Sequence, residues 1–274
     1  MSQIRRQFAA PIALRHDQTR GFNPVHSLFD TDIGSVAVVA AELDRGEKIH
    51  AHWHDWAQLV FSVNGVLSVI TDEGFWVVPP NRAVWIPPLK KHSFQIRTHL
   101  EMRTLYISPA LAEQQPDHCC VLQVSLLLRE IVHRLLEYPV EYGDDSPQAR
   151  LTAVVLDELK IAPRTPLHVP RPTHAKLRVI AEHITNNPAD TRTLGEWGAK
   201  LGASERTLAR LFRQDTGMSF AQWRQQVRLV MALEMLADSK PVTQVAIELG
   251  YESPSAFIAM FRKSLGTTPR RYFG

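Results

Sequence analysis

The chain has 274 residues, of which 45% are hydrophobic, and its formal net charge is +3. It is long enough for two domains, and no stretch approaches the ~18 consecutive apolar residues of a membrane-spanning helix. Residues 1–20 mix polar and apolar side chains without the apolar core of a signal peptide, so we expect a cytoplasmic protein.

Charge is divided unevenly along the chain. Residues 171–274 contain 15 Lys/Arg and 9 Asp/Glu, whereas residues 1–170 contain 16 and 19. A basic C-terminal part is typical of a nucleic-acid-binding module, although a solvated basic face gives the same balance. The two cysteines, Cys119 and Cys120, are adjacent and have neither disulfide-framework nor zinc-finger spacing, so we expect reduced, partly buried thiols.

Short β-type runs follow one another from Gly34 to about Tyr106. The seven runs are Val36–Leu43, Gln58–Val63, Val66–Thr71, Phe75–Val78, Ala83–Ile86, Ser93–Arg97 and Met102–Ile107. Turn signals, including an Asn-Gly pair and two Pro-Pro pairs, separate them. Strands this short and closely spaced predict an antiparallel sandwich or small barrel, which we place in residues 1–115.

Histidines recur within this β region at a characteristic spacing. A first group consists of Gly46, His52, His54, Gln58 and Gly65, and a second of Pro87, Leu89 and His92. These spacings resemble the two cupin motifs, except that Gln58 stands where the first motif has an acid and Leu89 where the second has glycine. The resemblance implies a jelly-roll barrel, and we expect this barrel to be an effector-sensing domain.

The four polar side chains of these motifs are candidates for one binding site. Residues two apart on a strand face the same side, so His52 and His54 should both point inward, with Gln58 on the same parity and His92 arriving from another strand. Three neutral imidazoles and an amide oxygen suit Zn, Ni, Cu or Fe. The same groups also suit an organic effector without metal, and incidental polarity is the third interpretation.

A helical region is expected next, in residues 116–172. Apolar stripes occur in Val121–Leu136 and in Gln148–Leu159, and they either cover the barrel or form a homodimer interface. Four prolines then follow, at positions 163, 166, 170 and 172. They rule out a continuous helix and predict a semi-rigid linker to a last domain, residues 173–274.

The last domain contains a helix-turn-helix pattern twice. The first copy has Leu201, Gly202, Ser204, Leu208, Phe212, Arg213 and Gly217, and the second has Leu249, Gly250, Ser253, Phe257, Phe261, Arg262 and Gly266. Each glycine after the Leu suits a helix end, and each serine suits the N-cap of the following helix. Between the copies, Phe220–Asp238 predicts a helix of roughly 28 Å, close to the ~34 Å between successive major-groove faces.

This layout resembles the AraC/XylS family of bacterial transcriptional regulators over about the last 100 residues. The stretch Val245–Tyr272 is similar to the family's signature segment. The resemblance implies an α+β multidomain protein: a cupin-like β-barrel, a helical linker and an all-α domain with two helix-turn-helix motifs. Its implied partners are double-stranded promoter DNA, a small-molecule effector and RNA polymerase, with a homodimer as the assembly and no membrane.

In each motif, the DNA-binding candidates lie at the start of the second helix or along it. They are Ser204, Arg206, Thr207, Arg210 and Arg213 in the first copy, and Ser253, Ser255, Arg262 and Lys263 in the second. Arginine can bond phosphate or the edge of guanine, whereas the second helix offers mainly small side chains such as Ala256 and Ala259. We therefore expect the first motif to discriminate bases and the second to hold the DNA backbone.

Two other function classes are also compatible with the sequence. One is a metal-dependent cupin enzyme, such as a dioxygenase or an isomerase, with an accessory DNA-binding domain. The amide of Gln58 at the usual acidic position weighs against it, and we expect no enzymatic activity. The other is a DNA-binding protein whose barrel serves only in oligomerisation.

Overall fold

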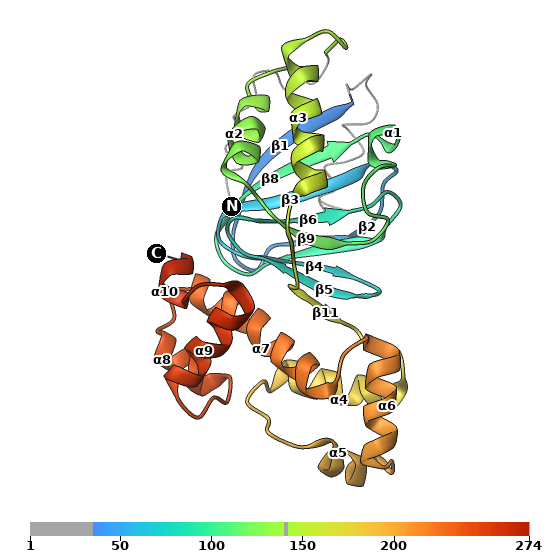
Figure 1. Cartoon of the computed structure of the whole chain (residues 1–274), viewed down its shortest axis with the longest axis vertical. Helices are drawn as coiled ribbons and strands as arrows, with labels where there is room; N and C mark the ends of the chain where they lie inside the picture. The colour runs from blue at the N-terminus through green and yellow to red at the C-terminus, as the bar shows by residue number, and fades with distance from the viewer. Residues whose placement is uncertain (1–34, 140–141, 274) are drawn as a thin grey trace. The chain divides into compact units, whose positions relative to one another are not determined.

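The computed structural model describes residues 35–139 and 142–273 (Figure 1). Of these, the residues up to Thr71 and Trp76–Pro166 form one compact unit, and Asp72–Phe75 with the residues from Leu167 onward form a second. The prediction about a signal peptide concerns residues 1–20 and lies outside the described residues. Within the described ranges, every helix is too short or too polar to cross a lipid bilayer.

The first unit is built on a jelly roll. Its strands are β1 (Val36–Leu43), β2 (Lys48–His52), β3 (Ala57–Asn64), β4 (Leu67–Thr71), β5 (Gly74–Val78), β6 (Arg82–Ile86), β7 (His92–Ile96), β8 (Leu100–Ile107), β9 (Cys120–Gln123) and β10 (Arg164–Thr165). The first two residues of β5, and the whole of β11 (His168–Pro170), which extends the second sheet, belong to the second unit. One sheet has the order β1-β8-β3-β6-β9-β10 and the other β11-β5-β4-β7-β2. The order β1-β8-β3-β6 in one sheet and β5-β4-β7-β2 in the other is the strand order of a jelly roll. The predicted fold class is therefore confirmed.

Alternate residues of the six-stranded sheet face opposite sides. Leu59, Phe61 and Trp85 belong to a buried apolar cluster with Ile131 and Val155. The last two come from α2 (Leu126–Leu135) and α3 (Pro147–Ile161), which cover this sheet in Figure 1; a short helix, α1 (Pro109–Ala112), precedes them. The helices therefore occupy the outer face, and the other face is left for the interior of the barrel.

The region after the barrel differs from the prediction in two places. The helix expected over Val121–Leu136 begins only at Leu126, because Cys120–Gln123 forms strand β9 against β6 and Ser125 caps the helix. The proline-rich segment is not only a linker, because it contains β10, which pairs with β9, and β11. Within the described residues neither Cys119 nor Cys120 forms a disulfide, and both side chains are buried.

The second unit is helical. Its helices are α4 (Ala175–Asn186), α5 (Leu194–Leu201), α6 (Glu205–Thr216), α7 (Phe220–Ala237), α8 (Val242–Glu248), α9 (Pro254–Leu265) and α10 (Pro269–Phe273). Gly202 and Gly250 have φ of +60° and +73°, the left-handed conformation that glycine tolerates at the end of a helix. Ser204 and Ser253 accept hydrogen bonds from the third residues of α6 and α9. Both predicted helix-turn-helix motifs are thus present, joined by α7.

Candidate functional site

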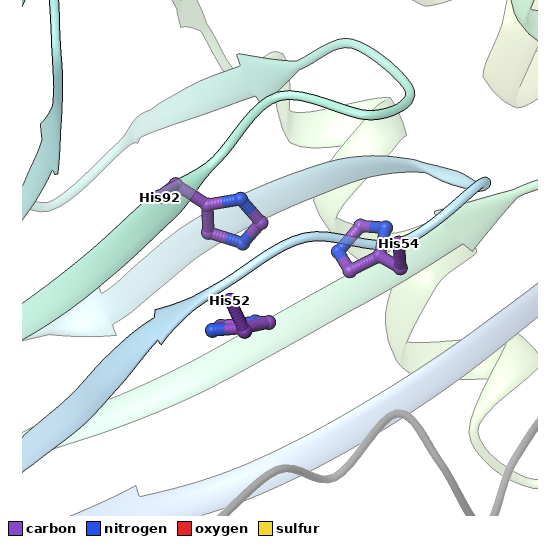
Figure 2. Close-up of side chains that lie close together, drawn as sticks. All are labelled: His52, His54 and His92. Carbon is purple, nitrogen blue, oxygen red and sulfur yellow. The ribbon is translucent and has the colours of Figure 1, made fainter.

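Three histidine rings meet inside the jelly roll (Figure 2). His52 at the end of β2 lies directly opposite His92 at the start of β7, and their ring centres are 4.3 Å apart. The ring of His54 is 5.2 Å from that of His92. One ring nitrogen of each histidine lies within 4.8 Å of the others, so a single small ligand could contact all three.

His54 is positioned by a turn and not by the strand that the sequence predicted for it. It lies beyond the end of β2, so the alternation of side chains along a strand does not place it. Its carbonyl oxygen accepts a hydrogen bond of 2.8 Å from the N–H of Leu89, in the turn before His92. Leu89 has φ +62°, the conformation for which the second cupin motif has glycine, and its exposed side chain leaves the turn intact.

Each of the three rings is held by a backbone carbonyl. The Nδ1 atoms of His52, His54 and His92 lie 2.8, 2.6 and 2.7 Å from the carbonyl oxygens of His50, Trp56 and Lys90. In a neutral imidazole, an Nδ1–H that donates to a carbonyl leaves Nε2 as the lone-pair nitrogen. Metal-binding histidines are oriented by hydrogen bonds of this kind.

Burial keeps these rings neutral. It lowers the pKa of His52 and of His54, and the nearby charge of His54 lowers the pKa of His52 further. Burial, followed by the nearby charge of His52, lowers the pKa of His92 to about 3. The Nε2 atom of His92 is buried and, within the described part of the chain, has no hydrogen-bond partner. A lone pair in that position can accept a hydrogen bond from a ligand or bind a metal ion.

Gln58 and Tyr106 complete the polar lining. They are opposite each other on β3 and β8, and the Gln58 amide donates to the Tyr106 hydroxyl over 3.3 Å. The amide oxygen lies 3.2 Å from Nε2 of His54. Two ligands of one tetrahedral zinc ion, each about 2.0–2.1 Å from the metal, are roughly 3.4 Å apart. His54 and Gln58 therefore have the spacing of two ligands of one ion, and the three histidine nitrogens lie close enough together to share it.

Tyr106 was not among the residues selected from the sequence. Its side chain is buried, and burial raises the pKa of its hydroxyl, which therefore stays protonated. The signal that could have found it is the parity of the predicted strand, on which Tyr106 alternates with outward-facing Leu105 and Ile107. His50, by contrast, is exposed and takes part only through its carbonyl oxygen.

The DNA-binding candidates of the first motif lie on the exposed side of α6. Arg206, Arg210 and Arg213 are exposed, whereas Leu208 and Phe212 on the opposite side are fully buried. Arg210 donates to Gln214 one turn further along, over 2.8 Å. The arginines are thus held on a rigid helix, free of ion pairs among the described residues, and available to phosphates or bases.

The serine and threonine candidates of this motif also maintain the helix. Ser204 accepts a hydrogen bond from the backbone N–H of Thr207 over 3.1 Å, and the two hydroxyl groups are 2.9 Å apart. Both residues are exposed at the N-terminal end of α6, where backbone N–H groups and the helix dipole favour an anion such as phosphate.

The second motif presents a different surface. On α9, Ser255 and Ala259 are exposed in the first half of the helix, and Arg262 and Lys263 are exposed in its last turn. Ser253 caps the helix through a 3.2 Å hydrogen bond from the backbone of Ala256. Positive charge is therefore concentrated at the C-terminal end, and small side chains occupy the part that would face base edges.

Two family models match this chain. Residues 36–148 match the AraC-like ligand binding domain, and residues 197–274 match a helix-turn-helix domain. The chain is 40% identical to the HTH-type transcriptional regulator NimR of Escherichia coli K12 over 221 residues, which is 81% of each chain. It is 36% identical to the HTH-type transcriptional regulator RipA of Corynebacterium glutamicum over 110 residues, 40% of this chain and 32% of RipA.

Among solved structures, the chain matches ToxT of Vibrio cholerae O395 at 11% identity and a TM-score of 0.36. The match covers 87% of this chain and 97% of ToxT. The arrangement described above, a jelly roll followed by two helix-turn-helix motifs, defines a ligand-responsive transcriptional regulator. With the two family models and the extent of the match to NimR, the chain belongs to the AraC family of DNA-binding transcriptional regulators.

Proposed function

We propose that the three-histidine cluster binds a divalent transition-metal ion, and that this ion is the signal which the regulator converts into a change in promoter binding. The observation that carries this proposal is the buried Nε2 atom of His92, which has no hydrogen-bond partner among the described residues. A buried acceptor without a partner costs on the order of 1–3 kcal/mol. Protonation of this nitrogen does not remove the cost near neutral pH, because the pKa of His92 is about 3.

The donor set indicates which ions suit the site. Three imidazole nitrogens and one amide oxygen favour Zn, Ni, Cu or Fe over the harder ions that prefer oxygen ligands. When bound, the ion would supply a positive charge shared by His52 and His92 from one sheet and Gln58 from the other. Binding would therefore link the two sheets of the jelly roll, and we propose that the DNA-binding unit responds to this linkage.

An organic effector is the second candidate, and one observation favours it. If the Gln58 amide is turned over, its NH₂ group faces His54 and its oxygen accepts from Tyr106, so both residues are satisfied without an ion. His92 still needs a partner in that arrangement. A hydroxyl or ammonium group of a small organic molecule would provide it.

We infer that the ion is sensed rather than used in catalysis. Gln58 provides no carboxylate at the position that is acidic in the cupin motif, so the site has no side chain there to take up a proton at neutral pH. A metal-dependent dioxygenase or isomerase is the rival function. The cytoplasm, where promoter DNA is found, is the compartment in which we propose that the protein acts.

We propose that α6 and α9, the second helices of the two helix-turn-helix motifs, both contact DNA. The exposed arginines of α6 would discriminate bases, and Arg262 and Lys263 of α9 would hold the phosphate backbone. Helix α7 has 18 residues, so at 1.5 Å per residue it spans roughly 27 Å. That length suits two helices in successive major grooves, which recur about every 34 Å.

A homodimer that contacts RNA polymerase completes the proposal. Leu126 and Leu127 on α2, and Val154 and Ile161 on α3, are exposed apolar side chains on the helices that cover the barrel. Apolar groups on a helical surface often mark an interface between subunits. Light scattering of the purified chain would measure the assembly directly.

The test uses the untagged full chain, stripped with a chelator, and an operator selected from random duplex DNA. Operator affinity is measured as Zn²⁺ or Ni²⁺ is added. We expect at least one ion to change the affinity of the wild type and of the control His50→Ala, whose exposed ring lies outside the cluster. His54→Ala should not respond. Equal responses in all three proteins, or no response to Zn, Ni, Cu or Fe ions in the wild type, would contradict the proposal.

A further inference from the structure

The loop between α4 and α5, residues 187–192, contacts both helix-turn-helix motifs. It leads directly into α5, whose N-cap is Thr193. It also lies against the turn of the second motif: a Cβ atom at Gly250 would be 2.8 Å from both the Cα and the carbonyl oxygen of Ala189. Only glycine allows so close an approach of two backbones, and Gly250 also has a positive φ.

Arg228 on α7 binds this loop through two hydrogen bonds. Its Nε donates to the carbonyl oxygen of Pro188 over 2.8 Å, and one terminal nitrogen donates to that of Asp190 over 3.2 Å. Its guanidinium lies 5.5 Å from the centre of the Tyr251 ring, in the turn of the second motif. Tyr251 in turn contacts Phe257 in the buried face of α9, at 5.5 Å between ring centres.

The loop is also fixed to the first motif. The carboxylate of Asp190 accepts hydrogen bonds from the backbone and the side chain of Arg192, at 3.0 and 2.7 Å, and from the ring of His183 at 3.1 Å. The Arg192 guanidinium stacks on Trp197 of α5, 4.1 Å from the ring centre. Arg224, one turn before Arg228, donates to the Arg192 carbonyl oxygen over 3.0 Å.

Arg228 is poorly placed to bind DNA itself. It is half-buried, and two of its donors are engaged by carbonyl oxygens of the loop. Its planar guanidinium bonds two carbonyls of the loop and faces the Tyr251 ring, so it connects α7 with both the loop and the turn of the second motif. The flexible ammonium of lysine cannot make this set of contacts. The contacts therefore run continuously from α5 through the loop and Arg228 to α9.

We propose that Arg228 is a positioning residue which, through the 187–192 loop, sets the relative orientation of α6 and α9 and so the spacing between the two DNA submotifs that the protein accepts. The inference depends on the proposal that both helices contact DNA. One extra base pair moves the second submotif by roughly 3.4 Å and turns it by roughly 35°. A rigid connection between the motifs rejects that change, and a loosened one tolerates it.

The experiment is a selection from randomised duplex DNA with the full chain. It compares the wild type with Arg228→Gln, Arg228→Lys and Gly250→Ala, and with Arg178→Gln, which removes the same charge from an exposed position on α4. Affinities are then measured for the selected site and for sites with one base pair added or removed between the submotifs. Circular dichroism checks that each variant is helical.

We expect the wild type and Arg178→Gln to select one spacing. The Arg228 variants and Gly250→Ala should accept neighbouring spacings, and their preference for the selected one should fall by about fivefold or more, which corresponds to about 1 kcal/mol. The salt dependence of binding should not change. Gly250→Ala and Arg228→Lys provide the test if Arg228→Gln does not fold.

Two results would overturn the inference. In the first, folded Arg228 variants keep the narrow spacing of the wild type. In the second, they lose affinity equally at every spacing with a shallower salt dependence, which would make Arg228 a phosphate contact. If the wild type itself selects a single submotif, the two-motif proposal fails, and this inference fails with it.

Discussion

Acid should destabilise the N-terminal unit, and His92 should account for a defined part of that loss. Its ring is 1% exposed, and burial followed by the charge of His52 lowers its pKa from 6.5 to about 3. In the unfolded chain the ring titrates near its ordinary pKa of about 6.5. The folded state therefore binds fewer protons than the unfolded state between these two values. The contribution to stability is fully present above about pH 6.5 and is lost as the pH falls toward about 3.

The size of the effect follows from the separation of the two pKa values. At about pH 5 the unfolded ring is almost always protonated, while the folded ring, with a pKa of about 3, is not. The pH is then about 1.5 units below the unfolded pKa, and each unit corresponds to about 1.36 kcal/mol, so the loss from His92 alone is about 2 kcal/mol. His52 and His54 add to it, because burial lowers the pKa of each.

The assay is urea unfolding at about pH 7.5 and about pH 5, with a chelator present so that no ion protects the rings. His92→Leu and His92→Gln replace the titrating group and leave His52 and His54 in place. The free energy of unfolding of the wild type should fall by about 2 kcal/mol more than that of either variant over this range. An equal fall in all three proteins would show that His92 is not buried in its neutral form.

Three further predictions concern the DNA-binding helices and one turn. Replacing Arg206 or Arg210 with Ala should cost roughly 1–3 kcal/mol on the selected operator and much less on random duplex; equal losses on both would exclude base readout by α6. Arg262→Ala or Lys263→Ala should weaken binding without changing sequence preference, and should lower the log–log salt slope by about 0.9; a new preferred sequence in selection would contradict this. Leu89→Gly relieves a positive φ at an exposed side chain, so thermal unfolding should show a gain of up to about 1 kcal/mol, and a clear loss would be evidence against strain there.

Local signals were sufficient for much of the fold. Glycine in the helix ends and serine at the N-caps predicted both helix-turn-helix motifs, because those residues satisfy specific backbone requirements. Strand β1 has the predicted limits, and the other predicted strands differ by one or two residues at their ends. Strand β2 is not among the seven predicted runs, although His52 and His54 were expected to share a strand, because only Ile49 is buried in a run of mostly charged and polar residues.

Long-range pairing explains what the sequence could not provide. The apolar run over Val121–Leu136 fits a helix or a strand, and only its pairing with β6 decides for a strand at Cys120–Gln123. The same holds at the histidine cluster. His52 and His92 are neighbours through strand register, and Gln58 meets Tyr106 through the pairing of β3 with β8.

The metal content of the protein tests the central proposal most directly. The full chain is purified without a histidine tag and without chelator, and its transition metals are measured by elemental analysis, beside His54→Ala and the control His50→Ala. We predict about one ion of Zn, Ni, Cu or Fe per chain in the wild type and the control, held by a site of this donor type, and a large loss in His54→Ala. A wild type without metal, or a His54→Ala variant with the same metal content, would contradict the account.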